Sequence, residues 1–428
     1  AFYLAEKGYK PVVFEKNERP GGMLTYGIPS FKLQKDVIEA EVEVIRLMGA
    51  EFRYGVEVGR DVTLDELREQ GFKAFYVAIG CQGGRLAGIP GEDAEDVTVA
   101  VDFLREVNSG KIDALPGRTI VVGGGNVAID VARNACRLGS EHVEMFCLES
   151  EAQMPASEEE RREAIEDGAH ISCGWGPKEV HLDESGRVCG ITFKRCTRVF
   201  DDEGRFAPEY DENDLRRVDA DRVVMSIGQS IVWGDLLAGS KVELGRGQGA
   251  LADPQTYQTA EPDIFVGGDV YTGPSFAIDA IAAGHEAAVS IHRFVQPGST
   301  LTIGRNQRRY TALDRDDVVI ESYDNASREV AHVNREREKA APFSEYVETF
   351  TEEQVRAETA RCLGCGASIV DPNKCIGCGL CTTKCAFDAI HLDRDRPECS
   401  TMVKYEQKLP SLGKYALKRA IKIKFGKK

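Results

Sequence analysis

The sequence predicts an α/β protein with two Rossmann-like dinucleotide-binding domains, one interrupted by the other, and a small C-terminal α+β ferredoxin-like module. Three observations predict this class. An apolar strand, a glycine-rich turn and a helix follow one another in residues 118–139, as in a βαβ nucleotide-binding unit. A second strand, turn and small-residue helix occupy residues 251–295. Four cysteines recur at short intervals between residues 375 and 385.

The first unit contains the run GGGNVA, the G-x-G-x-x-A form of the dinucleotide fingerprint, between the strand TIVV and the helix NVAIDVARNACRLG. Glycines permit the tight turn and the close approach of a pyrophosphate, and the alanine lets the helix pack closely on the strand. The N-terminus of the helix then faces the phosphates. The predicted residues of this NAD(H) site are Gly123, Gly125, Asn126, Val127 and Ala128.

The next strand ends at Glu149, in the run CLESE. A carboxylate at this point can accept hydrogen bonds from the adenosine ribose, and its charge repels a 2′-phosphate, for which an arginine is the expected partner. Glu151 strengthens that repulsion, and we expect no cation beside Glu149. The alternative is a solvated strand end. The pattern therefore favours NADH over NADPH.

Two further acidic residues predict a second dinucleotide site, for FAD. Glu15 closes the strand of residues 11–14, where an acid can bind a ribose. Gly268 and Asp269 form a turn at which the carboxylate can hydrogen-bond a ribityl chain, while the helix start at Ala277 faces the phosphates. Taken alone, Asp269 could be a helix cap or turn residue, but the surrounding strand–turn–helix pattern favours the flavin.

The cysteine run has the spacing of an iron–sulfur ligand set. In the pattern C-x2-C-x2-C-x3-C, a short loop brings each thiolate to a different iron of a 4Fe–4S cluster. A structural zinc site is the alternative, but its two cysteine pairs are usually separated by about a dozen residues or more. The predicted ligands, which imply single-electron transfer, are Cys375, Cys378, Cys381 and Cys385.

A second cluster is left open. Cys362 and Cys365 precede the run and Cys399 follows it, which gives one thiolate fewer than two complete four-cysteine clusters require. In two-cluster ferredoxins a proline follows the last cysteine of such a run, and here Ala386 follows it. The sequence therefore predicts one cluster, with Cys362 and Cys365 as candidate ligands of another.

Composition excludes some functions. The 428-residue chain has a formal charge of −16, which argues against a nucleic-acid-binding surface, and no apolar run is long enough to span a membrane. The cysteines follow a cluster pattern rather than a disulfide pattern, which favours a reducing cytoplasm.

The sequence begins inside a helix, without the strand and glycine-rich turn of a βαβ unit, so we expect a truncated piece that binds FAD poorly.

Four motifs together resemble the glutamate synthase small-subunit family of FAD-dependent oxidoreductases, within the pyridine nucleotide-disulfide oxidoreductase superfamily. They are GGMLTYGIPSFKL, GGGNVAID, MPASEEE and IFVGGDVYTGPSFAIDAIAAGHEAA. The resemblance implies that FAD accepts hydride from a nicotinamide and that electrons leave singly to iron–sulfur centres, without a redox-active disulfide. It also implies that the nicotinamide stacks on the flavin near Gly22, Tyr26 and Gly27.

In two respects the chain differs from that family. It lacks the arginines that NADPH-using members carry after the second strand, and its cysteine-rich segment follows the FAD domain instead of preceding it. We therefore expect a flavin-dependent NADH oxidoreductase subunit of a hetero-oligomer, which passes electrons to a partner protein. The alternatives are the small subunit of an NAD(P)H-dependent glutamate synthase and a non-catalytic NADH-sensing or scaffold subunit.

The expected domain boundaries follow from these motifs and from the charged composition after residue 300. They are the first part of the FAD-binding domain at 1–114, the NAD-binding domain at 115–230, the second part of the FAD-binding domain at 231–297, a charged linker at 298–360, the 4Fe–4S ferredoxin-like domain at 361–400 and a basic tail at 401–428.

Overall fold

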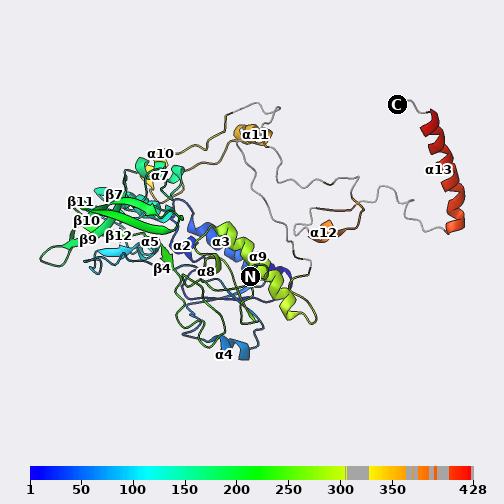
Figure 1. The fold of residues 1–428 in the computed structure, drawn as a ribbon, viewed down its shortest axis with the longest axis horizontal. Helices are drawn as coiled ribbons and strands as arrows, with labels where there is room; N and C mark the ends of the chain where they lie inside the picture. Colours follow the sequence, from blue (N-terminus) through cyan, green and yellow to red (C-terminus); the bar gives the residue numbers. More distant parts are fainter. Residues whose placement is uncertain are drawn as a thin grey trace. The chain divides into compact units, whose positions relative to one another are not determined.

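The computed structural model describes residues 1–303, 305, 327–362, 370, 375–384, 390–392 and 404–425. The chain divides into two compact units, Ala1–Val355 and Arg356–Lys428 (Figure 1). The first unit contains two dinucleotide-binding domains. We call residues 97–225 the inner domain, and residues 1–84 with 229–295 the outer domain.

A five-stranded parallel sheet forms the centre of the inner domain, in the order β5-β12-β6-β7-β8. Ile120, Val121 and Val122 are buried, as expected for a parallel strand that is covered on both faces. The strands are β5 (Val97–Val99), β6 (Arg118–Val122), β7 (His142–Cys147), β8 (His170–Cys173) and β12 (Arg222–Met225).

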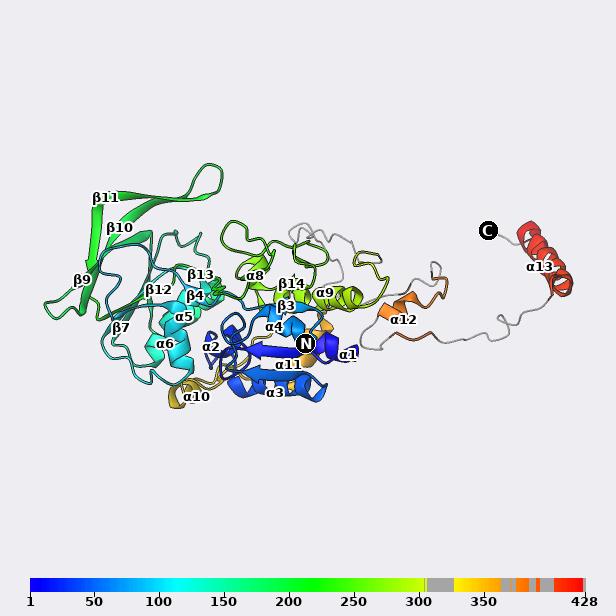
Figure 2. The ribbon, with the colours of Figure 1, turned by 90° about the horizontal axis from the view of Figure 1, so that it is seen from below.

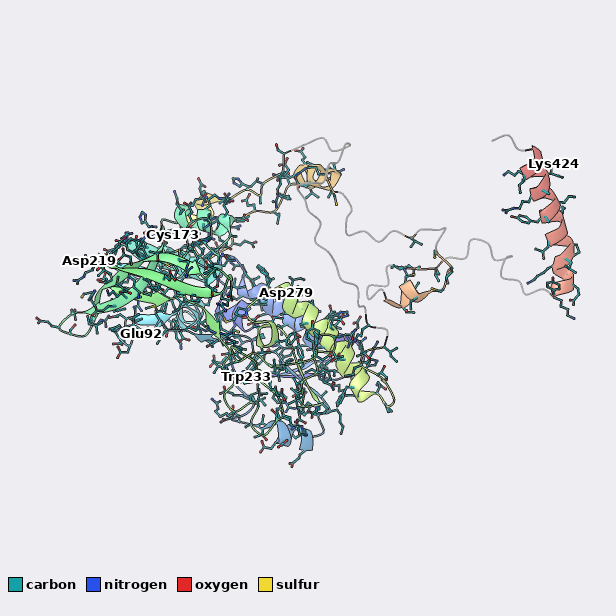
Figure 3. All side chains as sticks on the ribbon, viewed as in Figure 1. Glu92, Cys173, Asp219, Trp233, Asp279 and Lys424 are labelled. Atoms are coloured by element: carbon teal, nitrogen blue, oxygen red, sulfur yellow. The ribbon has the colours of Figure 1, made fainter. Side chains whose placement is uncertain are left out.

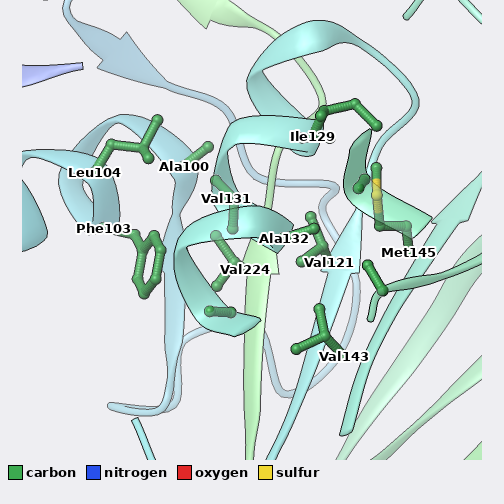
Figure 4. Packing of buried hydrophobic residues seen from close by; sticks show 14 of the residues in the cluster. Ala100, Phe103, Leu104, Val121, Ile129, Val131, Ala132, Val143, Met145 and Val224 are labelled. Atoms are coloured by element: carbon green, nitrogen blue, oxygen red, sulfur yellow. The ribbon is translucent and has the colours of Figure 1, made fainter. Parts of the chain in front are cut away.

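Helices cover one face of this sheet. Ile129 of α6 and Phe103 of α5 pack in one core with the strand residues Val121 and Met145 (Figure 4). Because α6 follows β6 directly, its N-terminal turn lies at the carboxyl edge of the sheet, where dinucleotides bind in this class of fold. The helices of the inner domain are α5 (Ala100–Asn108), α6 (Asn126–Arg137) and α7 (Glu158–Glu166).

An antiparallel meander covers the other face, in the order β11-β10-β9 (Figure 2). The ring of Phe146 on β7 stacks on that of Phe193 on β10, with the centroids 3.9 Å apart. The strands β9 and β10 form an antiparallel hairpin, in which Leu182 pairs with Val188. The meander strands are β9 (Trp175–Leu182), β10 (Val188–Phe200) and β11 (Phe206–Val218).

The outer domain contains two separate two-stranded parallel sheets, β1-β2 and β14-β3, and a small antiparallel pair, β13-β4. The β14-β3 pair joins segments on either side of the inner domain in sequence, so the predicted interruption of one dinucleotide domain by the other is confirmed. The strands are β1 (Val12–Glu15), β2 (Glu51–Tyr54), β3 (Phe75–Val77), β4 (Gly83–Gly84), β13 (Gln229–Ser230) and β14 (Ile264–Val266).

The helices of the outer domain lie around these sheets. The longest, α9, follows β14 after the short helix α8, and Ala283 and Ala287 on its inner side are buried. The helices are α1 (Phe2–Glu6), α2 (Met23–Tyr26), α3 (Lys35–Leu47), α4 (Leu64–Glu69), α8 (Asp269–Thr272) and α9 (Ala277–Val295).

Part of the range expected to be a charged linker belongs to the first unit and packs on its inner domain. We call residues 332–348 the strap. It contains the bridge between Val333 and Val347 and the helix α10 (Arg335–Ala340). Tyr346 of the strap is buried, and its hydroxyl accepts a hydrogen bond of 2.5 Å from Arg133 of α6. The helix α11 (Glu352–Ala360) spans the division between the two units.

The second unit contains α12 (Leu380–Lys384) and α13 (Tyr405–Phe425). The side chains of α13 that the structure describes are exposed, including those of Leu417 and Ile421. Within the described part of the chain, no helix combines the length and the apolar character that a membrane span requires.

Candidate functional site

The glycine-rich turn between β6 and α6 has the predicted form. Gly123 has φ 144°, and a Cβ there would lie 2.2 Å from the backbone oxygen of Ser226. A Cβ on Gly124 would lie 2.8 Å from the Cβ of Cys147. Gly125 caps the helix in an extended conformation and faces open space, so its Cβ would meet nothing. The first two positions therefore require glycine, and the turn leaves room for a phosphate group.

A neighbouring loop is tied to this turn. The backbone N–H of Ala156 donates to the carbonyl of Gly124 at 2.9 Å, and the N–H of Ser157 donates to Oδ1 of Asn126 at 3.2 Å. Ser157 also caps α7, because its hydroxyl accepts a hydrogen bond from the N–H of Glu160. The MPASEEE motif thus acts as a support for the turn.

Glu149 lies beside the turn. Its Oε2 is 3.1 Å from the position that a Cβ on Gly124 would occupy, and the side chain is half-buried. Its backbone oxygen accepts a hydrogen bond of 2.9 Å from the N–H of Gly174, which fixes the end of β7 against the end of β8. Such a carboxylate at the carboxyl edge of the sheet is suited to a ribose diol.

The structure corrects one expectation about this region, that no cation lies nearby. A pocket of about 290 Å³ opens beside the loop after β7, and Arg195 and Arg198 of β10 line it together with Ser150. The guanidinium of Arg195 stacks on Trp175, 5.1 Å from the ring centroid, and Arg198 pairs with carboxylates of the meander. The pairing of β10 within the meander brings these arginines to the pocket, so no local sequence pattern predicts that they lie there.

In the outer domain, the strand-end acid is held in place by a neighbour. Oε1 of Glu15 accepts hydrogen bonds from the backbone N–H and the Nδ2 of Asn17, at 2.9 and 2.6 Å. Oδ1 of Asn17 in turn accepts from Arg105 at 2.9 Å. Arg105 also donates to Oε1 of Gln82 at 2.7 Å and lies over the ring of Tyr26, 5.2 Å from its centroid.

Arg105 therefore joins the end of β1 to the segment that the resemblance assigns to the nicotinamide, and sequence reasoning missed it. In that segment Gly22 has φ 51°, and a Cβ there would lie 3.5 Å from Nε2 of Gln82. Gly27 is buried, and a Cβ there would come within 3.0 Å of the carbonyl oxygen of Met23. Both glycines thus permit a compact turn around α2.

The second predicted flavin contact, Asp269, lies against the segment that follows β3, where the Cys81 thiol donates to its carbonyl oxygen at 3.8 Å. Gly268, with φ 66°, precedes Asp269 at the start of α8, and Oδ1 of Asp269 accepts from the N–H of Ser275 at 3.3 Å. Burial raises the pKa of Asp269 above its ordinary value. Large apolar side chains are exposed around the start of the helix that begins at Ala277, notably that of the preceding Phe276, whose exposed fraction is 73%.

An ionic cluster connects the two domains. Nζ of Lys32, in the GIPSFKL segment, lies 2.6 Å from Oδ1 of Asp130 on α6 and also pairs with Glu160 on α7. Burial raises the pKa of Asp130 to about 6, although the ammonium of Lys32 opposes that rise. Burial alone would lower the pKa of Lys32, but the two carboxylates hold it above its ordinary value. The cluster thus stabilises a charged lysine between the domains.

Lys35 holds the α2 segment in a different way. Its Nζ donates to the backbone oxygens of Leu24 and Ile28, at 3.0 and 2.5 Å. Burial lowers the pKa of Lys35 to about 8. Lys35 therefore fixes the loop that contains Gly27, whereas Lys32 of the same FKLQK run pairs with the inner domain.

The cysteine motif is described in part. Cys362, Cys375, Cys378 and Cys381 are exposed, and Cys365 and Cys385 lie outside the described residues. Among the residues that the structure describes, no three histidine, cysteine or carboxylate side chains lie close enough together to hold a metal ion. The donor set nevertheless fits an iron–sulfur cluster, because all of these ligands are thiols at short, regular spacing.

The comparisons with known proteins agree with these two kinds of site. Residues 1–284 match the family model of the pyridine nucleotide-disulphide oxidoreductases, and residues 368–391 match the 4Fe-4S binding domain. The chain belongs to the pyridine nucleotide-disulphide oxidoreductase family and carries a C-terminal 4Fe-4S binding domain. The predicted fold class and family are therefore confirmed.

Several characterised relatives are similar over most of the chain. The beta subunit of the NADP(+)-dependent formate dehydrogenase of Moorella thermoacetica is 34% identical over 85% of this chain and 52% of its own length. The small chain of the NADPH glutamate synthase of Escherichia coli (strain K12) is 33% identical over 68% of this chain and 65% of its own. The chain thus spans about half the length of the first relative.

Solved structures show the same fold. FprA from Mycobacterium tuberculosis (its His57Gln mutant) aligns with a TM-score of 0.58 and 19% identity, over 68% of this chain and 82% of its own length. At that identity the likeness concerns the fold of the two dinucleotide-binding domains and nothing more specific.

Proposed function

We propose that the chain is a subunit of a flavin-dependent oxidoreductase that takes electrons from NADH and passes them through its C-terminal cluster to a partner protein in a hetero-oligomer. The single observation that carries this proposal is the coexistence in one chain of a well-formed dinucleotide turn, Gly123–Gly125, and a 4Fe-4S binding domain. Of the two relatives above, one is named a beta subunit and the other a small chain, which supports a hetero-oligomeric role. A reducing cytoplasm fits the free cysteines of the described residues.

The candidate site residues have different roles, which follow from where they lie in the two domains. When bound, FAD would accept a hydride and release its two electrons one at a time, and the cluster would supply single-electron transfer. Glu15 and Asp269 are suited to hold the flavin's ribose and ribityl hydroxyls, and the turn at Gly123 holds the nicotinamide dinucleotide. The α2 segment, fixed by Lys35 and Arg105, would lie against the reacting rings and exclude water from them.

Preference for NADH over NADPH is the finer part of the proposal. A 2′-phosphate beside Glu149 would meet a carboxylate with poor compensation, which costs on the order of 1–3 kcal/mol, or roughly ten- to a hundredfold in affinity. Arg195 in the adjoining pocket reduces this cost without removing the repulsion from the carboxylate of Glu149 itself. The preference should therefore lie near the lower end of that range.

The test of cofactor preference uses two variants of the full chain. Glu149→Arg should bring NADPH affinity level with or above NADH affinity, measured by fluorescence titration. Arg195→Ala is the matched variant: it should weaken NADPH binding and leave NADH binding nearly unchanged. Equal affinities of the unsubstituted protein for both dinucleotides would contradict the proposed role of Glu149.

The test of the electron path uses anaerobic protein and NADH. Visible absorption typical of a 4Fe–4S cluster should bleach when NADH is added to flavin-loaded protein, and Cys381→Ser should lose much of that absorption. Cys189→Ser, in the meander, is the control and should bleach normally. Stoichiometric zinc without iron in the purified protein would rule out the relay.

A glutamate synthase small subunit is the second candidate, favoured by the 33% identity to the small chain of the Escherichia coli NADPH glutamate synthase. The two candidates differ in partner. Purification of the native complex would distinguish them, because a glutamate synthase would contain a large amidotransferase subunit.

A further inference from the structure

We propose that Cys147 and Cys173 form a redox-sensitive dithiol beneath the dinucleotide turn. In our proposal, a low-molecular-weight disulfide converts the pair into an intramolecular disulfide, and this modification weakens dinucleotide binding. Cys173 is labelled in Figure 3, on the inner domain. The thiol chemistry stands on its own, and only its effect on binding rests on the proposed function.

The geometry of the pair comes from the sheet. Cys147 is the last residue of β7 and Cys173 the last of β8, and the two are direct partners in the parallel register. Their sulfur atoms are 3.7 Å apart. Neighbouring strands lie about 4.8 Å apart, within the range of roughly 4.4–6.8 Å between Cα atoms that a disulfide bridges. Formation of the bond therefore requires the sulfurs to approach, but it requires no change of register.

The two thiols differ in access. Cys173 lines the pocket of about 290 Å³ beside the β7 loop, so a small disulfide reaches it from solvent. Cys147 is buried, with 3% of its surface exposed, and burial raises the pKa of its thiol well above the ordinary value. Cys173 therefore reacts first and Cys147 second.

The reaction balances as two thiol–disulfide exchanges. The Cys173 thiolate attacks the oxidant RSSR, which forms a mixed disulfide and releases one RSH after the leaving thiolate takes up the proton. The Cys147 thiol then loses its proton, attacks the Cys173 sulfur and releases the second RSH. Two protein thiols are oxidised and one RSSR is reduced to two RSH.

The consequence for binding follows from what Cys147 touches. Its Cβ lies 2.8 Å from the position of a Cβ on Gly124, so it packs directly under the turn. Its sulfur also contacts the backbone oxygen of Glu149 at 3.7 Å. Since a disulfide bond is about 2.0 Å long, the two sulfurs, now 3.7 Å apart, must move toward each other when the bond forms. The side chain of Cys147 then leaves its present contacts under the turn and beside Glu149, so the packing of both parts of the proposed dinucleotide site changes.

The test oxidises the full, anaerobically purified chain with glutathione disulfide, alkylates the remaining thiols and digests with trypsin. Cleavage after arginine and lysine separates the two cysteines, so we expect a cross-linked pair of peptides, residues 138–161 joined to residues 163–178. Its amount should rise with pH between 7 and 9, because the thiols must ionise. The oxidised protein should bind NADH at least about threefold more weakly, and dithiothreitol should restore the affinity.

Three variants make the result specific. Cys147→Ser should stop at a stable mixed disulfide on Cys173, and Cys173→Ser should form neither product. Cys196→Ser is the matched control, since Cys196 lines the same pocket but its sulfur contacts the backbone oxygen of Arg198 at 3.4 Å. It should behave like the unsubstituted protein.

Two outcomes would overturn the inference. If the unsubstituted protein holds a mixed disulfide on Cys173 that does not resolve, the pair is no dithiol switch. If the cross-link forms quantitatively but NADH affinity stays unchanged, the coupling to the dinucleotide site is wrong, whether or not the proposed enzyme function holds.

Discussion

The inner and outer domains are built from the same kind of unit, but their strands differ in how completely they are joined into one sheet. The five inner strands form one sheet, and Ile120, Val121 and Val223 are fully buried in it. The outer strands form two separate parallel pairs, and α9 exposes Phe276 and Ile278 at its start. The inner domain, whose strands and helices follow one another in sequence, thus completes its own core, whereas the outer domain depends on pairing between distant segments.

The largest expected effect on stability concerns a buried arginine on α6 of the inner domain. Arg133 has a side chain only 1% exposed, and it pairs with Asp167 at 2.7 Å and with Glu163. Arg133→Leu should lower the free energy of unfolding by about 3 kcal/mol, because Glu163 and the Tyr346 hydroxyl lose this partner and Asp167 keeps only Arg137. Urea unfolding followed by circular dichroism measures this.

An exposed pair provides the control for that variant. Arg60 pairs with Glu57 and Asp61 on the surface of the outer domain, so Arg60→Leu should not change the urea midpoint measurably. Similar losses in both variants would contradict the view that burial, rather than charge pairing itself, makes Arg133 important.

Hydrogen exchange compares the local stability of the inner and outer strands directly. Backbone amides of β6, β7 and β12 should exchange only through global unfolding, whereas those of the β1-β2 and β14-β3 pairs should exchange about a hundredfold faster through local opening. Adding FAD should slow exchange in the outer strands only. Equal protection in both domains of the flavin-free protein would show that the outer pairs form a continuous, stable core.

The third prediction concerns the glycine turn. Gly123→Ala forces a Cβ against the Ser226 carbonyl in a backbone conformation that favours glycine, so it should cost about 1–3 kcal/mol and abolish measurable NADH binding. Gly125→Ala, which faces open space, is the matched control and should remain folded with little loss of stability. Thermal unfolding and NADH titration of both variants test this, and equal damage in the two would contradict it.

The smallest expected effect concerns pH and the interdomain cluster. Because the pKa of Asp130 rises from 3.8 to about 6 on folding, the folded state binds more protons than the unfolded state between these values. Stability from this group therefore falls as pH rises through that window. The stability gained by Asp130→Asn should be about 1 kcal/mol larger at pH 7 than at pH 5.

The comparison variant for this prediction is Lys32→Met. Removal of the ammonium should shift the titration of Asp130 to higher pH, since Lys32 opposes its rise. A pH-independent difference between Asp130→Asn and the unsubstituted protein, measured by urea unfolding at each pH, would show that Asp130 does not titrate in this range.

The sequence predicted what depends on neighbouring residues in the chain. The strand, turn and helix around Gly123 are contiguous, and so their order, and the approach of Glu149 to the turn, follows from local pattern alone. The interruption of the outer domain was also predictable, because Asp269 repeats the strand–turn–helix pattern far downstream of Glu15.

Contacts made through tertiary packing could not be predicted. Arg105 joins Asn17, Gln82 and Tyr26 only because α5 packs beside α2, and Arg195 reaches the β7 pocket only through the register of the meander. The strap belongs to the same class: its charged composition indicates solvent exposure, yet its Tyr346 and Glu338 bind the buried arginines of α6. Composition alone does not identify which charged residues form ion pairs or hydrogen bonds in the folded protein.

The helix α6 has a consequence for engineering. Its first turn closes the dinucleotide site, its middle carries Asp130, and Arg133 and Arg137 near its end hold the strap. Redesign of cofactor preference that substitutes residues on this helix would therefore disturb the interdomain cluster and the strap at once. The side chains of the loop of residues 148–153 hold neither the interdomain cluster nor the strap, and Ser150 bonds to Gln153 within the loop itself. This loop is therefore the better place for a library of variants.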